Sequence, residues 1–175
     1  LTLSVPDNNL VIQKRIRLSS VITEPIDRLY TKVISYCHSY HPDLEFNTGG
    51  GDPLEPALAH RDLTADYITW IDIGCPSYKK LSKPVRSHYA PNVRLYFFRD
   101  GHKNEFYTEF REWGAEYLSR ITCYQIDPGF LEQLSAQDQR TSEWSVTLLE
   151  GAIYLDANGI SYDSLIQKID LIELM

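Results

Sequence analysis

Apolar residues recur along this chain at two different spacings, and these predict a succession of helices and strands. The clearest helical spacing places apolar residues three and four apart at Ile26, Leu29, Tyr30, Val33, Ile34 and Cys37. These positions share one face of a helix, so we expect an amphipathic helix that packs against a sheet. Thr23 is placed to cap this helix, Pro25 suits its first turn, and His41-Pro42 should end it.

The other segments read as short strands and helices. We predict an N-terminal hairpin over residues 1–18, strands at 43–46, 67–73, 93–98 and 121–126, and a closing hairpin of 145–149 and 152–156. Further helices are expected at 77–89, 104–119 and 127–134, and Pro84 should bend or shorten the first of these. The run VRLYFF, residues 93–98, is almost continuously apolar and predicts a strand buried on both faces.

This order of elements predicts an α/β fold, with a mixed sheet flanked by helices and additional β-hairpins. Residues 47–56, NTGGGDPLEP, are the least regular stretch and are expected to form a loop. The triple glycine at 49–51 lacks the lysine of a phosphate loop, so we interpret it as a mobile connection, with a flap over the site as the alternative. Residues 1–175 are expected to form a single domain.

Charge constrains the class of partner. The 24 acidic residues outnumber the 17 Lys and Arg residues, giving a net charge of −7, which argues against general coating of DNA or RNA. A local basic patch remains, because Lys79, Lys80, Lys83 and Arg86 occur within eight residues that contain no acid. Two interpretations stay open for this patch: a solvated helix face, or a site that faces a phosphate.

Cysteine usage and hydropathy bear on location. The odd number of cysteines, Cys37, Cys75 and Cys123, and their wide spacing argue against a disulfide framework and favour a reducing cytoplasm. No run approaches the roughly 20 apolar residues of a membrane helix, and no secretory leader is recognised. We therefore expect a cytoplasmic protein with no membrane partner.

The first candidate for chemistry is a set of acids with nearby lysines. Asp72 ends an apolar strand, where a carboxylate gains nothing unless it meets water, a cation or a donor. Asp52 and Glu55 lie on the preceding loop, and a returning strand could bring them to Asp72. Carboxylates are ligands for Mg²⁺ or Mn²⁺, and Lys80 or Lys83 could neutralise a phosphate. Surface acids beside an Asp-Pro turn are the alternative interpretation.

The histidines and cysteines are weaker candidates. Cys37, His38 and His41 lie at the end of one predicted helix with no distant fourth ligand, which disfavours a metal site there. Cys75 is interpreted as a structural thiol rather than a nucleophile, because no nearby base can be identified.

An ordered set of motifs between about Leu18 and Ile160 resembles the YaeQ family, a group of small bacterial proteins. The amphipathic helix is followed by DLEFN, then by DPLEP, WIDIGCP with its basic continuation, VRLYFF and EGAIYLD. The resemblance implies a variant of the restriction-endonuclease-like, or PD-(D/E)xK, fold. In that superfamily a helix precedes three strands, and a carboxylate on the second strand joins an acid-any-lysine triplet on the third.

The resemblance also implies roles for individual residues. Glu55 matches the acidic position of the family's Glu-Pro segment, with Asp52 as its alternative, and Asp72 matches the Glu of a Trp-Ile-Glu-Leu-Gly pattern. Lys80 and Lys83 match the family's basic positions. The chain departs from the nuclease pattern at two positions: Gly74 stands where the triplet has lysine, and Pro84 stands where the family has alanine.

The candidate residues and the resemblance lead to two possible functions. The first is a phosphodiesterase or nuclease-like activity on nucleic acid that depends on Mg²⁺ or Mn²⁺, with Asp72, Glu55 and Asp52 as metal ligands and Lys80 and Lys83 as catalytic groups. The second is a protein that keeps the nuclease fold, has lost catalysis, and binds a protein or a nucleic acid through the basic helix.

Overall fold

The computed structural model describes residues 1–18, 24–47, 52–137 and 142–171 of the chain. In these ranges ten strands form one mixed sheet, in the order β2-β1-β8-β9-β10-β7-β6-β5-β4-β3. The strands are β1 (Thr2–Val5), β2 (Leu10–Gln13), β3 (Glu45–Phe46), β4 (Leu58–Arg61), β5 (Tyr67–Ile73), β6 (Asn92–Phe97), β7 (Ile121–Ile126), β8 (Trp144–Leu149), β9 (Ala152–Ala157) and β10 (Ile160–Ile169). The helices are α1 (Ile26–His38), α2 (Tyr78–Arg86), α3 (His102–Phe110), α4 (Ala115–Leu118) and α5 (Pro128–Ser135), with a 3-10 turn at Pro6–Asn8.

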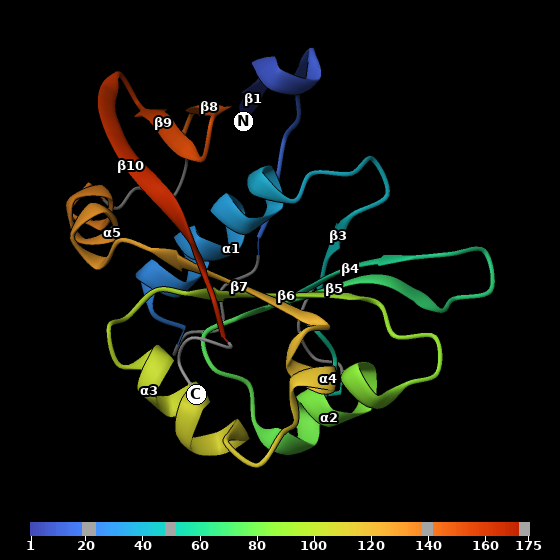
Figure 1. The fold of residues 1–175 in the computed structure, drawn as a ribbon. Helices are drawn as coiled ribbons and strands as arrows, with labels where there is room; N and C mark the ends of the chain where they lie inside the picture. Colours follow the sequence, from blue (N-terminus) through green and yellow to red (C-terminus); the bar gives the residue numbers. More distant parts are fainter. Residues whose placement is uncertain (19–23, 48–51, 138–141, 172–175) are drawn as a thin grey trace.

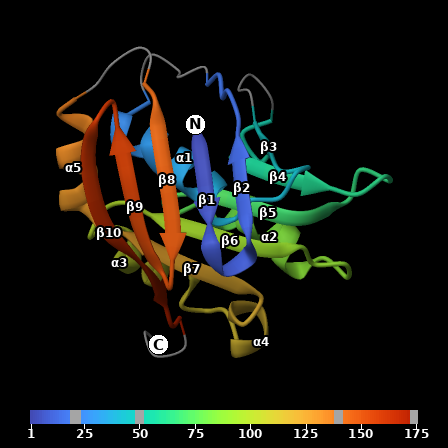
Figure 2. The same ribbon diagram turned by 90° about the horizontal axis from the view of Figure 1, so that it is seen from above.

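The sheet has two parts that are joined by the long strand β10. Residues 160–165 of β10 pair antiparallel with β9, and residues 166–169 pair antiparallel with β7. Figures 1 and 2 show β10 running from the part that contains β8 and β9 to the part that contains β5, β6 and β7. In the second part β5, β6 and β7 are parallel, whereas β3, β4 and β5 are antiparallel.

Helices cover both faces of the β3–β7 part of the sheet. Helices α1 and α5 lie between the two parts of the sheet, and α2, α3 and α4 cover the opposite face (Figure 1). Alternation along β5 explains this layering: Ile71 and Ile73 pack on the α1 side, and Trp70 packs on the α2 side with Leu81. This confirms the expected mixed α/β sheet with helices on both faces.

Several elements agree with the pattern of the sequence. The N-terminal hairpin forms as β1 and β2, the closing hairpin forms as β8 and β9, and the VRLYFF strand is buried at Val93, Leu95, Tyr96, Phe97 and Phe98. Helix α5 begins where Asp127-Pro128 predicts it, and the Asp127 carboxylate accepts a hydrogen bond from the Phe130 backbone N–H. Helix α2 contains Pro84 and ends at Arg86, so it is shorter than the range 77–89.

Other predictions are wrong or incomplete. Strand β4 falls within a stretch whose pattern predicts no element, and β10 extends over residues that have no clear pattern of their own. The single helix expected over 104–119 is two helices, because the chain turns between Arg111 and Gly114 before α4 begins. Thr23 and the glycines at 49–51 lie outside the described residues. No helix within the described ranges has the length and hydrophobicity needed to span a membrane.

Candidate functional site

Asp72 is a buried carboxylate at the end of β5. It lies two residues after Trp70, so its side chain is on the same face of the sheet, which α2 covers. Only 2% of its surface is exposed. One carboxylate oxygen accepts a hydrogen bond from the Ile73 backbone N–H at 3.1 Å. A buried carboxylate needs a counter-charge, since desolvation strongly penalises an isolated charge.

Lys80 supplies that counter-charge from α2. The hydroxyl of Ser77 caps this helix by accepting a hydrogen bond from the Lys80 backbone N–H, which fixes the first turn beside the end of β5. The Lys80 ammonium forms an ion pair with the Asp72 carboxylate and lies 5.7 Å from the centre of the Trp70 ring. The side chain of Lys80 is 16% exposed, so this pair lies at the boundary between core and solvent.

Burial and the ion pair act on Asp72 in opposite directions. Burial raises the pKa of the Asp72 carboxyl above its ordinary value, and the Lys80 ammonium opposes this shift. The larger of the two effects is burial. Asp72 is therefore a carboxylate whose charged form depends on an adjacent cation, which is the property expected of a metal ligand or of a structural ion pair.

A cavity of about 370 Å³ opens beside this ion pair, and we call it the α2 pocket. The loop before β4 contributes Asp52 and Glu55, and α2 contributes Lys79, Lys80 and Lys83. Tyr67 and Trp70 of β5, together with Tyr89, add aromatic rings to its wall. Four of the five site residues suggested by the sequence therefore line one pocket. The fifth, Asp72, forms an ion pair with one of them, Lys80.

The three acids do not converge on a single point. Within the described ranges, one group of three His, Cys, Asp or Glu side chains brings its ligand atoms within 4.8 Å of one another, and that group does not include Asp52, Glu55 or Asp72. Glu55 instead lies 3.6 Å from Arg61, and the Asp52 carboxylate accepts a hydrogen bond from the Leu54 backbone N–H. A metal bound by these acids would require their side chains to rearrange.

The backbone explains why no lysine stands two residues after Asp72. Gly74 has a φ of +83°, and a Cβ at this position would lie 3.3 Å from Phe98 Cε1 and 3.4 Å from His102 Cε1. Its N–H donates a hydrogen bond to the Tyr96 carbonyl at 2.8 Å, which holds the backbone in place. Only glycine suits both the dihedral angle and the space. The ammonium near Asp72 therefore comes from α2.

The other sequence candidates are structural. Burial raises the pKa of the Cys37 thiol and of the Cys75 thiol to about 12, so neither is a thiolate at neutral pH. His38 Nδ1 lies 2.7 Å from the Tyr96 hydroxyl, and burial lowers the pKa of His38 to about 4. These groups form no metal cluster with His41 within the described residues.

Sequence reasoning missed the group that does converge, which consists of His41, Asp43 and His60. The spacing of His41 and Asp43 is visible in the sequence, but His60 belongs to strand β4, which the sequence pattern does not predict. Only the pairing of β4 with β3 brings His60 to the other two residues.

Comparisons with known proteins agree with the fold described above. The sequence model of the YaeQ protein family matches residues 1–164. An uncharacterized YaeQ protein of Salmonella typhi is 22% identical over 149 residues, which span 85% of this chain and 81% of the relative.

Two crystal structures show the same fold. The YaeQ protein from Pseudomonas syringae superimposes with a TM-score of 0.81 at 18% identity, over 96% of this chain and 91% of that chain. The YaeQ protein from Xanthomonas axonopodis pv. citri gives a TM-score of 0.80 at 20% identity, over 96% and 93% of the two chains.

Proposed function

The chain belongs to the YaeQ family, and we propose that its α2 pocket is the site of a phosphodiesterase that acts on nucleic acid and depends on Mg²⁺ or Mn²⁺. The observation that carries this proposal is the buried ion pair of Asp72 and Lys80, whose lysine lines a pocket together with Asp52, Glu55 and Lys83. Carboxylates that face lysines across a small cavity are suited to a phosphate and its metal counter-ion.

The order of elements supports a restriction-endonuclease-like variant as the underlying fold. Helix α1 precedes three antiparallel strands, β3, β4 and β5, and α2 then leads to β6, which is parallel to β5. The third of these strands carries Asp72, and Glu55 lies three residues before the second. The order of the helix and the three strands is the one that the family resemblance implies, whereas Glu55 lies just before the second strand rather than on it, and Gly74 stands at the position of the triplet lysine. Fold alone does not establish catalysis, so the proposed activity depends on the residues of the pocket.

The donor set suits a hard divalent cation. Asp72, Glu55 and Asp52 offer only carboxylate oxygens, the ligands that Mg²⁺ and Mn²⁺ prefer. The contact between Lys80 and Asp72 already places a positive charge beside the carboxylate. A bound Mg²⁺ or Mn²⁺ would polarise a phosphoryl oxygen and lower the pKa of a coordinated water.

The lysines and aromatic rings suit a nucleic acid. Lys79 and Lys83 make no ion pair with a carboxylate among the described residues, so both ammonium groups are available for phosphate oxygens. Tyr89, which is 82% exposed, lies at the same pocket and can stack on a base. The role of Lys80 is to neutralise charge beside Asp72, and that of Lys83 is to bind the phosphate.

The second candidate is a non-catalytic protein that binds nucleic acid at the same pocket. The observation that favours it is the pairing of the acids: Asp72 already has Lys80 as its partner, and Glu55 lies near Arg61. In this case the ion pair is structural, and the remaining lysines contact a phosphate backbone without cleaving it.

One experiment separates these functions. End-labelled single-stranded DNA, double-stranded DNA and RNA are incubated with the protein and millimolar MgCl₂ or MnCl₂, and both cleavage and binding are measured. Catalysis predicts cleavage of at least one substrate that is lost in Asp72→Asn, and retained in Lys168→Met, an exposed lysine on β10. Binding that requires Lys83, with no cleavage in either metal, supports the non-catalytic candidate. If the protein neither cleaves nor binds any of these substrates, both candidate functions are refuted.

A further inference from the structure

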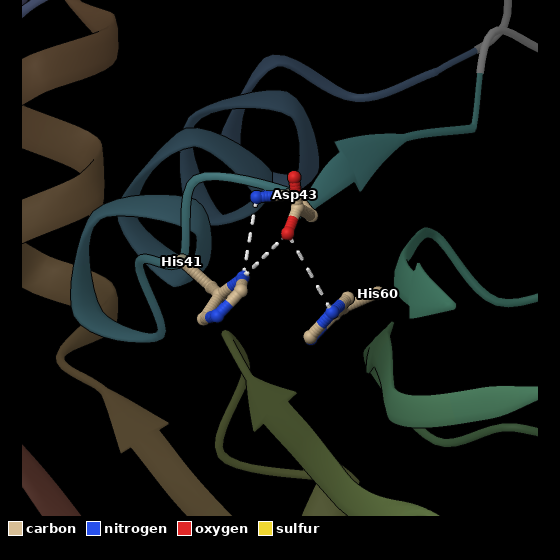
Figure 3. Close-up of side chains that lie close together, drawn as sticks. All are labelled: His41, Asp43 and His60. Carbon is tan, nitrogen blue, oxygen red and sulfur yellow. Dashed lines mark hydrogen bonds and ion pairs between the residues drawn. The ribbon is translucent and has the colours of Figure 1, made fainter. Parts of the chain in front are cut away.

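We propose that His41, Asp43 and His60 form a second metal site, selective for a transition-metal ion of the zinc type. His41 and Asp43 lie in the turn between α1 and β3, and His60 lies on β4 (Figure 3). None of the three lines the α2 pocket, so the two proposed sites share no ligand, although Glu55 lines both that pocket and the cavity beside this cluster.

The two imidazole rings approach the same carboxylate oxygen. His41 Nδ1 lies 3.7 Å from Asp43 Oδ2, and His60 Nε2 lies 4.0 Å from that atom. The rings of His41 and His60 stack, with 4.1 Å between their centres and 17° between their planes. The ligand atoms of all three residues lie within 4.8 Å of one another, and Figure 3 shows the two rings flanking the carboxylate.

Sheet pairing and a turn together produce this arrangement. In the antiparallel pair of β3 and β4, Glu45 pairs with Ala59 and Phe46 pairs with Leu58, so one further step sets His60 beside the start of β3. His41 and Asp43 lie just before β3, in a turn that the Leu44 backbone N–H closes with a hydrogen bond to the His41 carbonyl at 3.0 Å. Strand pairing therefore positions His60, and the turn positions the other two ligands.

The ligand set matches zinc chemistry. Zinc binds imidazole nitrogen and carboxylate oxygen at about 2.0–2.2 Å, and three protein ligands with one open position are typical of its catalytic sites. Those bond lengths correspond to about 3.3 Å between ligand atoms of a tetrahedron, so the two separations from Asp43 Oδ2 are longer by about 0.4 and 0.7 Å. The lone pairs of the imidazole nitrogens lie in the ring planes, and these planes are only 17° apart. The His41 ring, whose side chain is 47% exposed, would therefore turn out of the stack for both nitrogens to face one ion.

His41 already presents a suitable nitrogen. The Asp43 backbone N–H donates a hydrogen bond to His41 Nδ1 at 3.2 Å, so this nitrogen carries a lone pair rather than a proton. A metal requires the same neutral form of the ring. Binding through Nδ1 would replace this exposed backbone hydrogen bond.

One ligand of the proposed site is largely buried and the other two are exposed, so an ion could reach the site from solvent. The His60 side chain is only 13% exposed and is therefore held by its surroundings, whereas His41 and Asp43 are 47% and 74% exposed. Asp43 and His60 also line a cavity of about 790 Å³, together with Glu45, Asn47 and Arg61. An open coordination position of the ion would therefore lie beside a cavity that is large enough for a small molecule.

Calorimetric titration with Zn²⁺ alone tests this site. With excess Mg²⁺ present to occupy the proposed carboxylate site of the α2 pocket, the expected result is a saturable Zn²⁺ site that is weakened roughly tenfold or more in Asp43→Asn and in His60→Gln. His88→Gln, which removes an exposed histidine outside the cluster, should bind Zn²⁺ as the wild type does. Mg²⁺ in excess should not compete, because imidazole is a poor ligand for it.

Spectroscopy with Co²⁺ gives a second measurement. Co²⁺ in a site with two imidazoles and a carboxylate should produce visible absorption bands that Zn²⁺ displaces and that Asp43→Asn removes. Asp43 is exposed, so this variant should fold even if His60→Gln does not. An absence of saturable Zn²⁺ binding, or binding that Asp43→Asn leaves unchanged, would overturn the proposal.

Discussion

The Lys80 ammonium and the Asp72 carboxylate form a buried ion pair that connects the first turn of α2 to the end of β5. Asp72 is 2% exposed, and the side chain of Lys80 is 16% exposed. The stability of this part of the fold and the chemistry of the α2 pocket both depend on this pair.

Removing one member of the pair should destabilise the protein. Lys80→Met leaves the Asp72 carboxylate buried without a counter-charge, so we expect a loss of about 3–5 kcal/mol in the free energy of unfolding. The matched control is Lys79→Met, since Lys79 is an exposed neighbour on the same helix and should lose less than about 0.5 kcal/mol. Urea denaturation measures both variants, and a Lys80→Met variant as stable as the wild type would show that the pair contributes nothing.

Lys80 should also compete with a metal for Asp72. If the carboxylate binds Mg²⁺, removing the adjacent ammonium should raise the affinity for Mg²⁺ by roughly tenfold, while cleavage falls because the phosphate loses a cation. Titration of Mg²⁺ into Lys80→Met and into Lys79→Met checks this. Equal affinities in the two variants would place the metal away from Asp72.

Gly74 should tolerate no side chain. Gly74→Ala adds a Cβ at a φ of +83° and brings it within 3.4 Å of Phe98 and His102, so both strain and crowding act. Gly159→Ala is the matched control, because its φ is +85° and a Cβ there meets no atom within 4 Å. We expect Gly159→Ala to cost about 1–2 kcal/mol and Gly74→Ala to cost more. Thermal unfolding that gives equal losses would show that crowding contributes nothing.

Gly74 also bears on catalysis. Gly74→Lys would restore the acid-any-lysine triplet in sequence only, since Phe98 and His102 occupy the space beside this residue. We therefore expect Gly74→Lys to unfold more readily than the wild type and to show no gain in cleavage. A folded Gly74→Lys variant with faster cleavage would contradict the role assigned to Lys80.

His38 should make stability depend on pH. Its pKa is lowered by burial to about 4 from an ordinary value of 6.5, so the unfolded chain binds a proton more readily than the folded chain between these values. The stability that the neutral, buried His38 ring gives to the folded state is fully present above about pH 6.5, and it is lost as the pH falls toward about 4. Between about pH 7 and about pH 5 the loss is about 2 kcal/mol.

A substitution isolates the effect of His38 from that of Asp72. The raised pKa of Asp72 works in the opposite direction, because protonation of a buried carboxyl at low pH favours the folded state. Urea denaturation of the wild type and of His38→Gln at both pH values gives the difference. A loss of stability that is equal in the two proteins would assign the pH dependence to other groups.

The lysines of the α2 pocket should govern affinity for nucleic acid. Lys83→Met removes one exposed cation that lines this pocket, so affinity should fall for every nucleic-acid sequence alike. The slope of the logarithm of the binding constant against the logarithm of the salt concentration should decrease in magnitude by about one. Lys168→Met on β10 is the control for a loss of charge elsewhere. Identical salt dependence in both variants would exclude Lys83 from the interface.

The sequence was informative wherever one short pattern determined one element. The apolar stripe of α1, the cap at Asp127 and the apolar strand that ends near Asp72 each depend on neighbours in the chain, and the structure agrees with all three. The same local logic identified Asp72 as a carboxylate on an inward face, because polar residues at such positions require a partner.

What the sequence did not reveal depends on contacts between distant segments. Strand β4 has only four residues, and its pairing with β3 and β5 defines it better than any alternation of its own. His60 is part of this strand, so the cluster with His41 and Asp43 could not be recognised. The partner of Asp72 was also ambiguous, because Lys79, Lys80 and Lys83 are equally basic and only the docking of α2 selects Lys80.

The most direct test asks whether Asp72 holds a divalent metal. Thermal unfolding is followed with and without Mg²⁺ in an Asp43→Asn background, because Asp43 is exposed and its loss disables the second metal site. We expect Mg²⁺ at roughly tenfold above its Kd to raise the Tm by about 3 °C or more, and Asp72→Asn to abolish this rise. A rise that persists in Asp72→Asn, or no rise at all, would contradict the assignment of the α2 pocket as a metal-dependent phosphodiesterase site.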